Sequence, residues 1–247
     1  YCEDESGVKA YVQTHLLDEI VLKEIINEVA NLCELSFTIT KVKQENWNKK
    51  WENNFEPVHI NDKCVIRAHF HAAFSDVEHE IIITPKMSFG TGHHETTSLM
   101  AKALFDVDLT NKSVLDAGTG TGLLAFVAKK RGAGFVRGFD IDEWSVENSI
   151  ENAGLNGCEE IPFALGTIAE EDATTYDVLL ANINRNILLA EMAEYAARIK
   201  PEGLLFLSGF YTEDIPLLLE SAEKQQLNFV AQASKNNWAC LQLRKKP

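Results

Sequence analysis

The feature that most limits the fold of this chain is a regular alternation of short apolar runs with helical segments, which begins at residue 113. The apolar runs are SVLDAG (113–118), FVRGFDI (135–141), YDVLLANI (176–183) and GLLFLSGF (203–210). The helical segments between them are GLLAFVAKKRG (122–132), DEWSVENSIENAGLNG (142–157) and NRNILLAEMAEYAARIK (184–200). Near-continuous apolar strands separated by helices are typical of a parallel sheet covered on both faces. The sequence therefore predicts an α/β fold for this part of the chain.

Particular residues mark the expected ends of these elements. Asp142 is well placed to cap the start of the second helix, Gly157 follows its end, and Pro201 is expected to stop the third helix. Segment 229–245 contains two strand-like runs around Asn236 and Asn237. These two runs predict an antiparallel pair at the edge of the sheet.

The amino-terminal residues follow a different pattern. VKAYVQT (8–14) and LSFTITKVK (35–43) are predicted strands, and the four-residue spacing of Leu17, Val21, Ile25 and Val29 predicts a helix between them. The polar segment that follows carries Trp47 and Trp51 and ends at Pro57. The two tryptophans are expected either to pack together locally or to have a hinge or docking role. We therefore expect a small α+β domain (1–45), a linker (46–57) and a larger domain (58–247), which begins with strands at CVIRAHF (64–70) and HEIIITP (79–85).

Composition limits the classes of partner and site. The formal net charge of -14 argues against nucleic-acid binding through a broad basic face; it either suits a cationic partner or serves only solubility. The five cysteines are far apart and form no C-x-x-C pair, so neither a disulfide framework nor a zinc site is expected, which fits a cytoplasmic protein. No apolar run approaches the roughly 18 residues needed to span a bilayer. His69, His71 and His79 lack the acidic or thiol partners of a metal site, so no metal is expected.

The glycine-rich turn after the first strand of the alternation is the main candidate for ligand binding. Gly118, Gly120 and Gly122 follow Asp116 at a strand-to-helix junction, where open α/β sheets bind ligands. Glycine lets the backbone approach a ligand closely, although such turns also occur for structural reasons alone. A dinucleotide fingerprint would require glycine or alanine where this chain has Leu123, so that pattern fails.

Two polar residues at the ends of later strands extend this candidate site. Asp140 ends the second strand about twenty residues past the turn, where a carboxylate can accept hydrogen bonds from both hydroxyls of a ribose; alternatively it caps the next helix. Asn182 ends what we count as the fourth strand, and its amide can both donate and accept beside a reacting amine; alternatively it is an ordinary turn residue.

The acidic-x-G-x-G-x-G pattern is similar to the first motif of class I S-adenosylmethionine-dependent methyltransferases. FGTGHHETT (89–97) resembles the F-G-T-G-x-H-x-T-T segment of the bacterial methyltransferases that modify ribosomal large-subunit protein eleven. The resemblance continues through LDAGTGTGLLA (115–125), FDID (139–142), NAGLNG (152–157), ANI (181–183) and LLFLSG (204–209), and covers roughly residues 46 to 245. The chain departs from the usual pattern at His93, where threonine is common, and at Glu95, where proline is common.

This resemblance implies a Rossmann-like fold with a mostly parallel seven-stranded sheet, an antiparallel edge and a small α+β amino-terminal domain. The implied cofactor is S-adenosylmethionine, and the implied reaction is methyl transfer to amines of a large-subunit ribosomal protein. The implied cofactor contacts are Thr91, Thr97, Gly118, Gly120, Asp140 and Asn182. Asn182 is also the expected catalytic residue, through positioning, and the two glycine turns are expected to grip one molecule from opposite sides.

The same resemblance assigns substrate recognition to the amino-terminal domain, for which the family pattern is βαββαβ. Only one strand-helix-strand is predicted here, so either part of that domain is missing from the sequence or the domain is reduced. His94 is a candidate general base or an orienting residue, and no base is assigned. We expect a cytoplasmic monomer that binds neither membrane nor nucleic acid. The rival interpretations are a methyltransferase for another protein or a small molecule, a non-catalytic binding module, and a nicotinamide enzyme.

Overall fold

The computed structural model describes residues 2–4, 7–9, 17, 19–29, 38–40, 56–85 and 90–247. The chain divides into two compact units, Tyr1–Trp47 and Asn48–Pro247. Of the predicted linker, 46–57, only Glu56 and Pro57 are described, and the tryptophan pair lies outside the described residues. The predicted domain limits therefore stay a prediction.

The first unit contains a short hairpin and a helix among its described residues. Strands β1 (Cys2–Asp4) and β2 (Gly7–Lys9) pair antiparallel, and helix α1 spans Glu19–Val29. The helix confirms the prediction from apolar spacing, although Val21 and Ile25 are 47% and 52% exposed. The predicted strand 8–14 is described only at residues 8 and 9. Residues 38–40 of the predicted strand 35–43 lie in no strand, and its other residues are not described.

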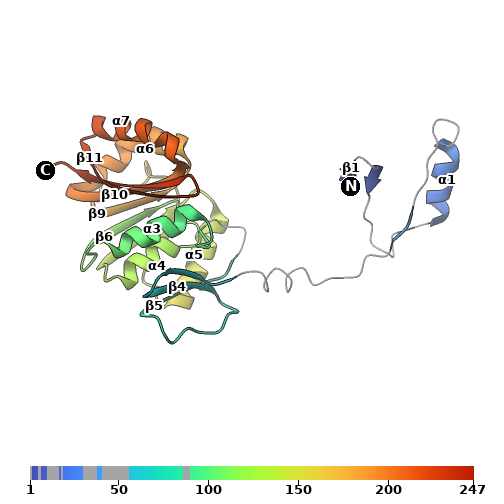
Figure 1. Ribbon diagram of the computed structural model, residues 1–247, viewed down its shortest axis with the longest axis horizontal. Coiled ribbons are helices and arrows are strands. Elements are labelled where there is room, and N and C mark those ends of the chain that lie inside the picture. Colours follow the sequence, from blue (N-terminus) through green and yellow to red (C-terminus); the bar gives the residue numbers. More distant parts are fainter. Residues whose placement is uncertain are drawn as a thin grey trace. The chain divides into compact units, whose positions relative to one another are not determined.

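The second unit is built on a seven-stranded sheet (Figure 1). Its strands are β6 (Ser113–Ala117), β7 (Phe135–Asp140), β8 (Phe163–Leu165), β9 (Tyr176–Asn182), β10 (Ile199–Tyr211), β11 (Leu227–Lys235) and β12 (Trp238–Lys245). They lie in the order β11-β12-β10-β9-β6-β7-β8. All neighbouring pairs are parallel except the two that include β12. The predicted mostly parallel sheet with an antiparallel edge is thus confirmed.

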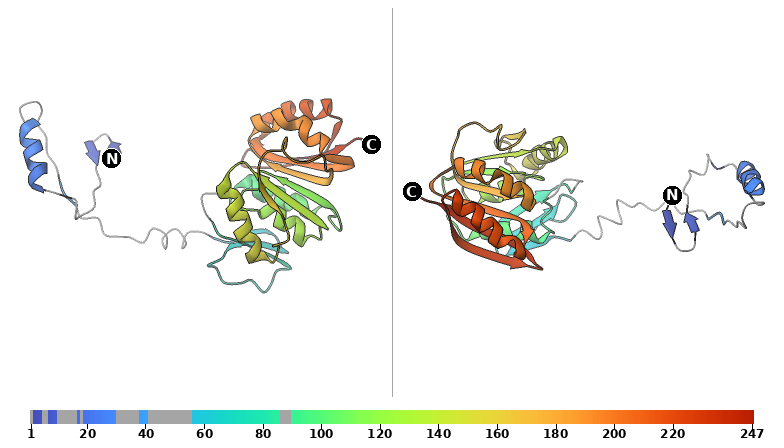
Figure 2. Two further views of the ribbon diagram at one scale, coloured as in Figure 1. Left: turned by 180° about the vertical axis from the view of Figure 1, so that it is seen from behind. Right: turned by 90° about the horizontal axis from the view of Figure 1, so that it is seen from above.

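Helices cover both faces of this sheet. They are α3 (Glu95–Phe105), α4 (Leu123–Lys130), α5 (Glu143–Asn156), α6 (Arg185–Ala197) and α7 (Ile215–Lys224). One core cluster joins α3, α4 and α5 to the sheet, and a second joins α6 and α7 to the opposite face. Figure 2 shows α6 and α7, in orange and red, together on one side. Successive residues of β6 alternate between the clusters, Val114 in the first and Leu115 in the second, which explains why such strands are apolar at every position.

A second, three-stranded sheet packs against the first core cluster. It consists of β3 (Val58–Asn61), β4 (Cys64–Ala68) and β5 (His79–Ile83), in that order, and β5 runs parallel to β4. Ile66 and Ile81 bring this sheet into the same cluster as α3, α4 and α5. The strands predicted at 64–70 and 79–85 are therefore confirmed.

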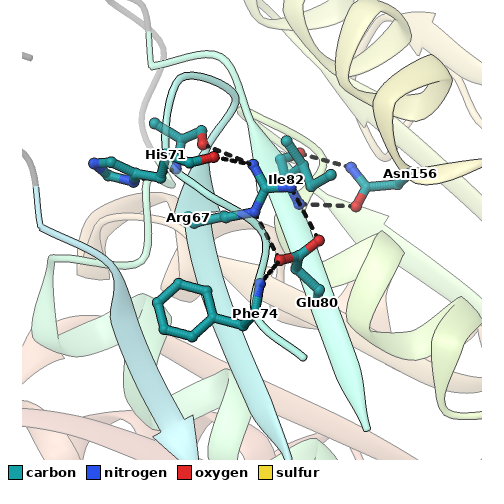
Figure 3. A network of polar contacts seen from close by, with 7 residues as sticks. Arg67, His71, Phe74, Glu80, Ile82 and Asn156 are labelled. Carbon is teal, nitrogen blue, oxygen red and sulfur yellow. Dashed lines mark hydrogen bonds and ion pairs between the residues drawn. The ribbon is translucent and has the colours of Figure 1, made fainter. Parts of the chain in front are cut away.

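Buried polar contacts hold this small sheet in place (Figure 3). The Arg67 guanidinium, 7% exposed, donates to both carboxylate oxygens of Glu80 at 2.7 and 3.0 Å. The other edge of β5 is paired by a side chain of α5, because the Asn156 amide accepts from the Ile82 N–H at 2.9 Å and donates to the Ile82 carbonyl at 2.7 Å. A single asparagine thus completes the pairing of an edge strand and ties it to a helix.

Two predictions about element boundaries are wrong. Helix α6 ends at Ala197, before Pro201, and β10 already begins at Ile199. Pro201 is tolerated inside this strand because the register between β10 and β9 shifts between Ile199 and Leu204. Helices α3 and α7 and strand β8 were not predicted. Gly157, in contrast, ends α5 with a left-handed φ of 63°, as predicted.

Candidate functional site

A cavity of about 720 Å³ opens at the carboxyl ends of the central strands. Its lining consists of His94, Thr96, Gly118, Gly120, Phe139, Asp140, Ile141, Asp142, Ser145, Thr167, Asn182, Ile183, Asn184, Ile187, Glu191, Gly209 and Trp238. The volume is within the range of small-molecule sites, and the position is where open α/β sheets bind ligands. Four predicted site residues, Gly118, Gly120, Asp140 and Asn182, meet here; Thr91 and Thr97 do not belong to this lining.

The glycine-rich turn connects β6 to α4 along the floor of this site. The Asp116 carboxylate lies beneath the turn, 1% exposed, and accepts a hydrogen bond from the Thr119 hydroxyl at 2.7 Å. Burial raises the pKa of Asp116 to about 7, and the neighbouring charge of Asp140 acts in the same direction. Asp116 therefore supports the turn from inside the protein and does not line the cavity.

Asp140 is the last residue of β7 and faces the cavity with 8% of its surface exposed. Its Oδ2 accepts from the Gly120 N–H at 2.9 Å, and its Oδ1 accepts from the Asp142 N–H at 3.1 Å. An ionised carboxylate has about four acceptor positions, so capacity remains for two ligand hydroxyls. Asp142 occupies the N-cap position of α5 without a side-chain capping bond, so the predicted side-chain cap is absent.

Asn182 is the last residue of β9, two strands away from Asp140 in the sheet order. Its Nδ2 donates to the Thr97 hydroxyl on α3 at 3.1 Å. Its Oδ1 is buried and has no hydrogen-bond partner within the described structure. A buried acceptor without a partner is unfavourable unless a ligand supplies the missing donor. The amide is therefore held by Thr97 with its oxygen available to a bound molecule.

Two glycines fix the backbone beside Asn182 by close packing against Ile183. A Cβ on Gly118 would lie 2.9 Å from the Ile183 side chain, and a Cβ on Gly209 would lie 2.3 Å from the Ile183 carbonyl oxygen. Both glycines have positive φ, 66° and 97°, which other residues rarely adopt. Gly209 also sits where the register between β10 and β12 shifts, between Ser208 and Phe210. Any larger residue at either position would displace the edge of the cavity.

The two glycine turns are joined directly. The Thr121 hydroxyl in the second turn donates to the Gly90 carbonyl in the first at 2.6 Å. Asn152 of α5, fully buried, donates to the Thr121 carbonyl at 2.9 Å and accepts from the Thr84 N–H at 2.8 Å. This relay links α5, the end of the small sheet and both turns. That the first turn closes over a ligand stays a prediction, and Lys86–Phe89 lie outside the described residues.

His94 is the N-cap of α3, and its ring also lines the cavity. Its Nδ1 lies 2.8 Å from the Thr96 hydroxyl and accepts from the Thr96 N–H at 3.4 Å. The imidazole meets the indole of Trp238 edge-on, with ring centroids 4.6 Å apart. These contacts place His94 as the cap of α3, and the choice between an orienting residue and a general base stays a prediction.

The sequence interpretation missed several residues that build the site, chiefly Thr121, Asn152, Gly209 and Trp238. Asn152 lies in the NAGLNG segment, which contributes to the family resemblance but gives this residue no role. Trp238 follows the predicted Asn236-Asn237 turn, and a single large aromatic residue at the start of an edge strand was the available signal. No local signal indicated Gly209, because its requirement comes from Ile183, which directly follows a different strand, β9.

In the part of the chain that the structure describes, no group of three His, Cys, Asp or Glu side chains is arranged to hold a metal ion. His71 instead accepts a hydrogen bond from the Ala68 N–H at 3.2 Å, and burial lowers the pKa of His79. Within the same residues, no helix combines the length and apolar character that a membrane span requires.

Comparisons with known proteins agree with this geometry. A family described as ribosomal protein L11 methyltransferase (PrmA) matches residues 1–246. A ribosomal protein L11 methyltransferase of Bacteroides fragilis is 46% identical over 244 residues, covering 98% of this chain and 87% of the relative. One of Porphyromonas gingivalis is 51% identical over 198 residues, covering 79% and 68%.

Solved structures give the same result for the fold. The crystal structure of a ribosomal protein L11 methylase from Lactobacillus delbrueckii subsp. bulgaricus has a TM-score of 0.72 at 25% identity, covering 78% of this chain and 100% of that chain. A putative methyltransferase complexed with SAH has a TM-score of 0.52 at 14% identity, covering 60% and 49%; its likeness concerns the fold alone. The family match spans nearly the whole sequence, and the chain belongs to the ribosomal protein L11 methyltransferase (PrmA) family.

Proposed function

We propose that this protein uses S-adenosylmethionine to methylate amines of ribosomal protein L11. The observation that carries the proposal is the pairing, in one cavity, of the Asp140 carboxylate with the unpartnered Asn182 Oδ1. The first suits a ribose and the second suits an N–H donor beside the reacting atoms. These two groups end strands on either side of β6, so the glycine turn lies between them.

The cofactor fits the residues present. Asp140 would hold the two ribose hydroxyls, since its backbone hydrogen bonds leave acceptor positions open. Gly118 and Gly120 would let the backbone approach the methionine end closely. Thr97 acts through Asn182 in the described structure, and its direct contact with the cofactor stays a proposal, as does that of Thr91.

When bound, S-adenosylmethionine supplies a methyl group on a positively charged sulfur, so the chain has to bind and align the reactants. Asn182 Oδ1 would accept an N–H of the acceptor amine and direct its lone pair toward the methyl carbon. A lysine amine has a reference pKa of about 10.4, and removal from water favours the neutral form that carries the lone pair. Alignment of this kind can lower a barrier by about 7 to 11 kcal/mol. We assign no general base.

The acidic character of the chain supports a basic protein substrate, because a formal charge of -14 attracts a cationic partner at long range. We further propose that the enzyme acts as a monomer in the cytoplasm, without a membrane or nucleic-acid partner. Recognition of the substrate by the amino-terminal unit belongs to the same proposal.

The test is incubation of the purified chain with ribosomal protein L11 and S-adenosylmethionine labelled in the methyl group. Label on amines of that protein is expected, with none when another basic ribosomal protein replaces it. Label on the other protein alone, or on neither, would overturn the substrate. Calorimetric titration with S-adenosylhomocysteine and with NAD tests the identity of the cofactor independently of the substrate. Tighter binding of NAD than of S-adenosylhomocysteine would overturn the whole proposal.

Two variants assign the roles of the site residues. Asp140→Ala should weaken binding of S-adenosylhomocysteine by roughly 10- to 100-fold, because it removes charged acceptors for two hydroxyls. Asn182→Ala should lower turnover more than it weakens cofactor binding. Equal and mild effects on both quantities would contradict this assignment, and thermal unfolding of each variant checks that the fold is retained.

A further inference from the structure

Trp238 occupies a position in the cavity that the cofactor-binding residues do not explain. It begins β12 and pairs with Tyr211 of β10. In the same register Ser208 of β10 lies opposite both Asn182 of β9 and Cys240 of β12. Trp238 is therefore two residues beyond the level of Asn182, at the carboxyl end of the sheet and on the side away from Asp140.

The indole of Trp238 belongs to a cluster of aromatic rings. Tyr211 lies against it with ring centroids 4.2 Å apart and planes tilted by 34°, and the His94 imidazole meets it at 4.6 Å. Trp238 and His94 both line the cavity. We call these two residues, supported by Tyr211, the aromatic wall.

Hydrogen bonds at the tip of the β11–β12 hairpin hold the aromatic wall. Asn236 and Asn237 have φ of 49° and 66°, which suits a tight two-residue hairpin turn. The Asn236 amide donates to Glu95 at the start of α3 at 2.8 Å, and the Asn237 carbonyl accepts from the Thr212 N–H at 2.8 Å. The wall is thus positioned from both sides before any ligand arrives.

The charges around the cavity favour a cation. Its described ionisable side chains are His94 and the acidic residues Asp140, Asp142 and Glu191; no lysine or arginine belongs to the described lining. Aromatic rings attract cations through their electron-rich faces, and quaternary ammonium groups are recognised by aromatic side chains in this way. An aromatic surface also accommodates N-methyl groups, which a fully polar surface does not.

We propose that the aromatic wall is the binding subsite for the N-methylated, cationic form of the acceptor amine. The inference rests on the proposed methylation of amines and extends it to the product. During transfer the amine lone pair forms the new N–C bond, the C–S bond breaks with its electron pair staying on sulfur, and positive charge passes to the nitrogen. The nitrogen then releases a proton to water if it is to accept another methyl group. The wall stabilises the charge as it arrives and holds the methylated amine for the next transfer.

The direct test measures the affinity of two small probes for the full chain in the presence of S-adenosylhomocysteine. Its probes are Nα-acetyl-Nε-trimethyllysine amide and the neutral isostere in which carbon replaces the ammonium nitrogen. We expect the cation to bind roughly tenfold more tightly than the isostere. Equal affinities would overturn the proposal, because the two probes share a shape and differ in charge.

Fluorinated tryptophan at position 238 separates charge attraction from packing. Mono-, di- and trifluorotryptophan keep the ring shape while weakening its attraction for cations, so affinity for the trimethyllysine probe should fall stepwise. The matched control is the same series of fluorinated residues at Trp144. This residue lies on α5, is 78% exposed and does not line the cavity. An affinity for the trimethyllysine probe that does not change with fluorination at position 238, or that changes equally at both positions, would contradict the inference.

Product analysis then connects the subsite to the reaction. Trp238→Leu should shift the methylated ribosomal protein toward singly methylated amines, while Trp238→Phe should keep most multiple methylation. Both variants should bind S-adenosylhomocysteine within about twofold of the original chain. If the original chain does not methylate L11, the proposed function fails, even if the chain binds the trimethyllysine probe more tightly than its neutral isostere. If the chain methylates L11 but binds both probes equally, only the inference about the aromatic wall fails.

Discussion

The hydrogen bond between Thr97 and Asn182 joins two residues 85 positions apart and sets the orientation of one amide. Because Nδ2 is engaged by Thr97, Oδ1 is the atom that remains for a ligand. The Thr97 hydroxyl thus fixes the Asn182 side chain in an orientation that leaves its oxygen free to accept a hydrogen bond. Positioning of this kind affects the rate of a reaction more than the affinity for its cofactor.

Thr97→Val tests this positioning, because valine has nearly the same shape but lacks the hydroxyl. We expect turnover to fall by roughly tenfold, since the Asn182 amide loses its fixed orientation. The dissociation constant for S-adenosylhomocysteine should change by a smaller factor than turnover does. Ser98→Ala on the same helix is the control and should change neither quantity. Loss of cofactor affinity with unchanged turnover in Thr97→Val would instead indicate a direct cofactor contact.

The buried carboxylate of Asp116 predicts how the free energy of unfolding depends on pH. Burial raises its pKa in the folded protein to about 7, whereas an aspartate in an unfolded chain has a pKa of about 3.9. Below pH 4 both states are protonated; as the pH rises, the unfolded chain releases its proton first. The free energy of unfolding should therefore decrease between about pH 4 and pH 7, by at most about 1.4 kcal/mol per pH unit from this group, and then level off.

Asp116→Asn removes this titration while keeping the side-chain shape. Urea unfolding of both proteins at pH 5.5 and pH 8 measures the effect. The variant should gain stability relative to the original chain as the pH rises. A difference between the two proteins that is the same at both pH values would show that Asp116 does not have a raised pKa.

At the scale of elements, the face of α5 formed by Asn148, Asn152 and Asn156 replaces a neighbouring strand along one edge of the small sheet. Asn156 pairs with Ile82, and Asn152 and Asn148 contact Thr84 through its N–H and its carbonyl. Asparagine is suited to this because its amide offers a donor and an acceptor in the geometry of a peptide group. The helix is thereby coupled to the small sheet and, through Thr121, to the glycine turn.

Asn152→Ala should destabilise the second unit and weaken cofactor binding together. It leaves the Thr84 N–H and the Thr121 carbonyl without partners, which should cost on the order of 2 kcal/mol in unfolding free energy. Asn152→Asp keeps the acceptor for Thr84 but loses the donor to Thr121, so it isolates the effect on the turn. Glu147→Ala, exposed on the same helix, should change stability by less than about 0.5 kcal/mol. Unfolding and titration with S-adenosylhomocysteine measure both effects; unchanged affinity in both Asn152 variants would contradict the coupling.

The elements also differ in how well the sequence predicted them. The strands β6, β7, β9 and β10 were predicted because each is apolar on both faces and bounded by helical segments. The end of α6 was predicted wrongly because a proline, Pro201, can stop a helix or lie at an irregularity of a strand, and the choice depends on the neighbouring strand. Helix α7 follows the end of β10 almost directly, so no loop separated its pattern from the strand.

At the scale of the whole molecule, the two units differ in what holds them together. Both core clusters of the described structure consist of residues between Ile60 and Leu243, all in the second unit. The described residues that line the cavity also belong to that unit. The described residues that form these clusters and line the cavity are therefore all retained in a chain that lacks Tyr1–Trp47.

Removal of residues 1–47 should consequently leave the affinity for S-adenosylhomocysteine unchanged and raise the KM for ribosomal protein L11. The expected increase is at least tenfold, because the family resemblance assigns substrate recognition to the amino-terminal unit. Calorimetry and initial-rate measurements on the shortened and full chains provide the comparison. A shortened chain with an unchanged KM would place substrate recognition in the second unit, and one that binds no cofactor would show that the units depend on each other.

The sequence by itself determined the parallel sheet, the antiparallel edge, the glycine turn and the location of Asp140 and Asn182 at strand ends. These follow from periodicity and turn residues, which act over a few neighbouring positions and report which faces of each element are buried. Only the tertiary structure decided that Thr97 holds Asn182, that Ile183 requires Gly118 and Gly209, and that Trp238 meets His94 at the cavity. Each of these contacts joins residues from different elements, so it depends on strand order and register, which no local pattern specifies.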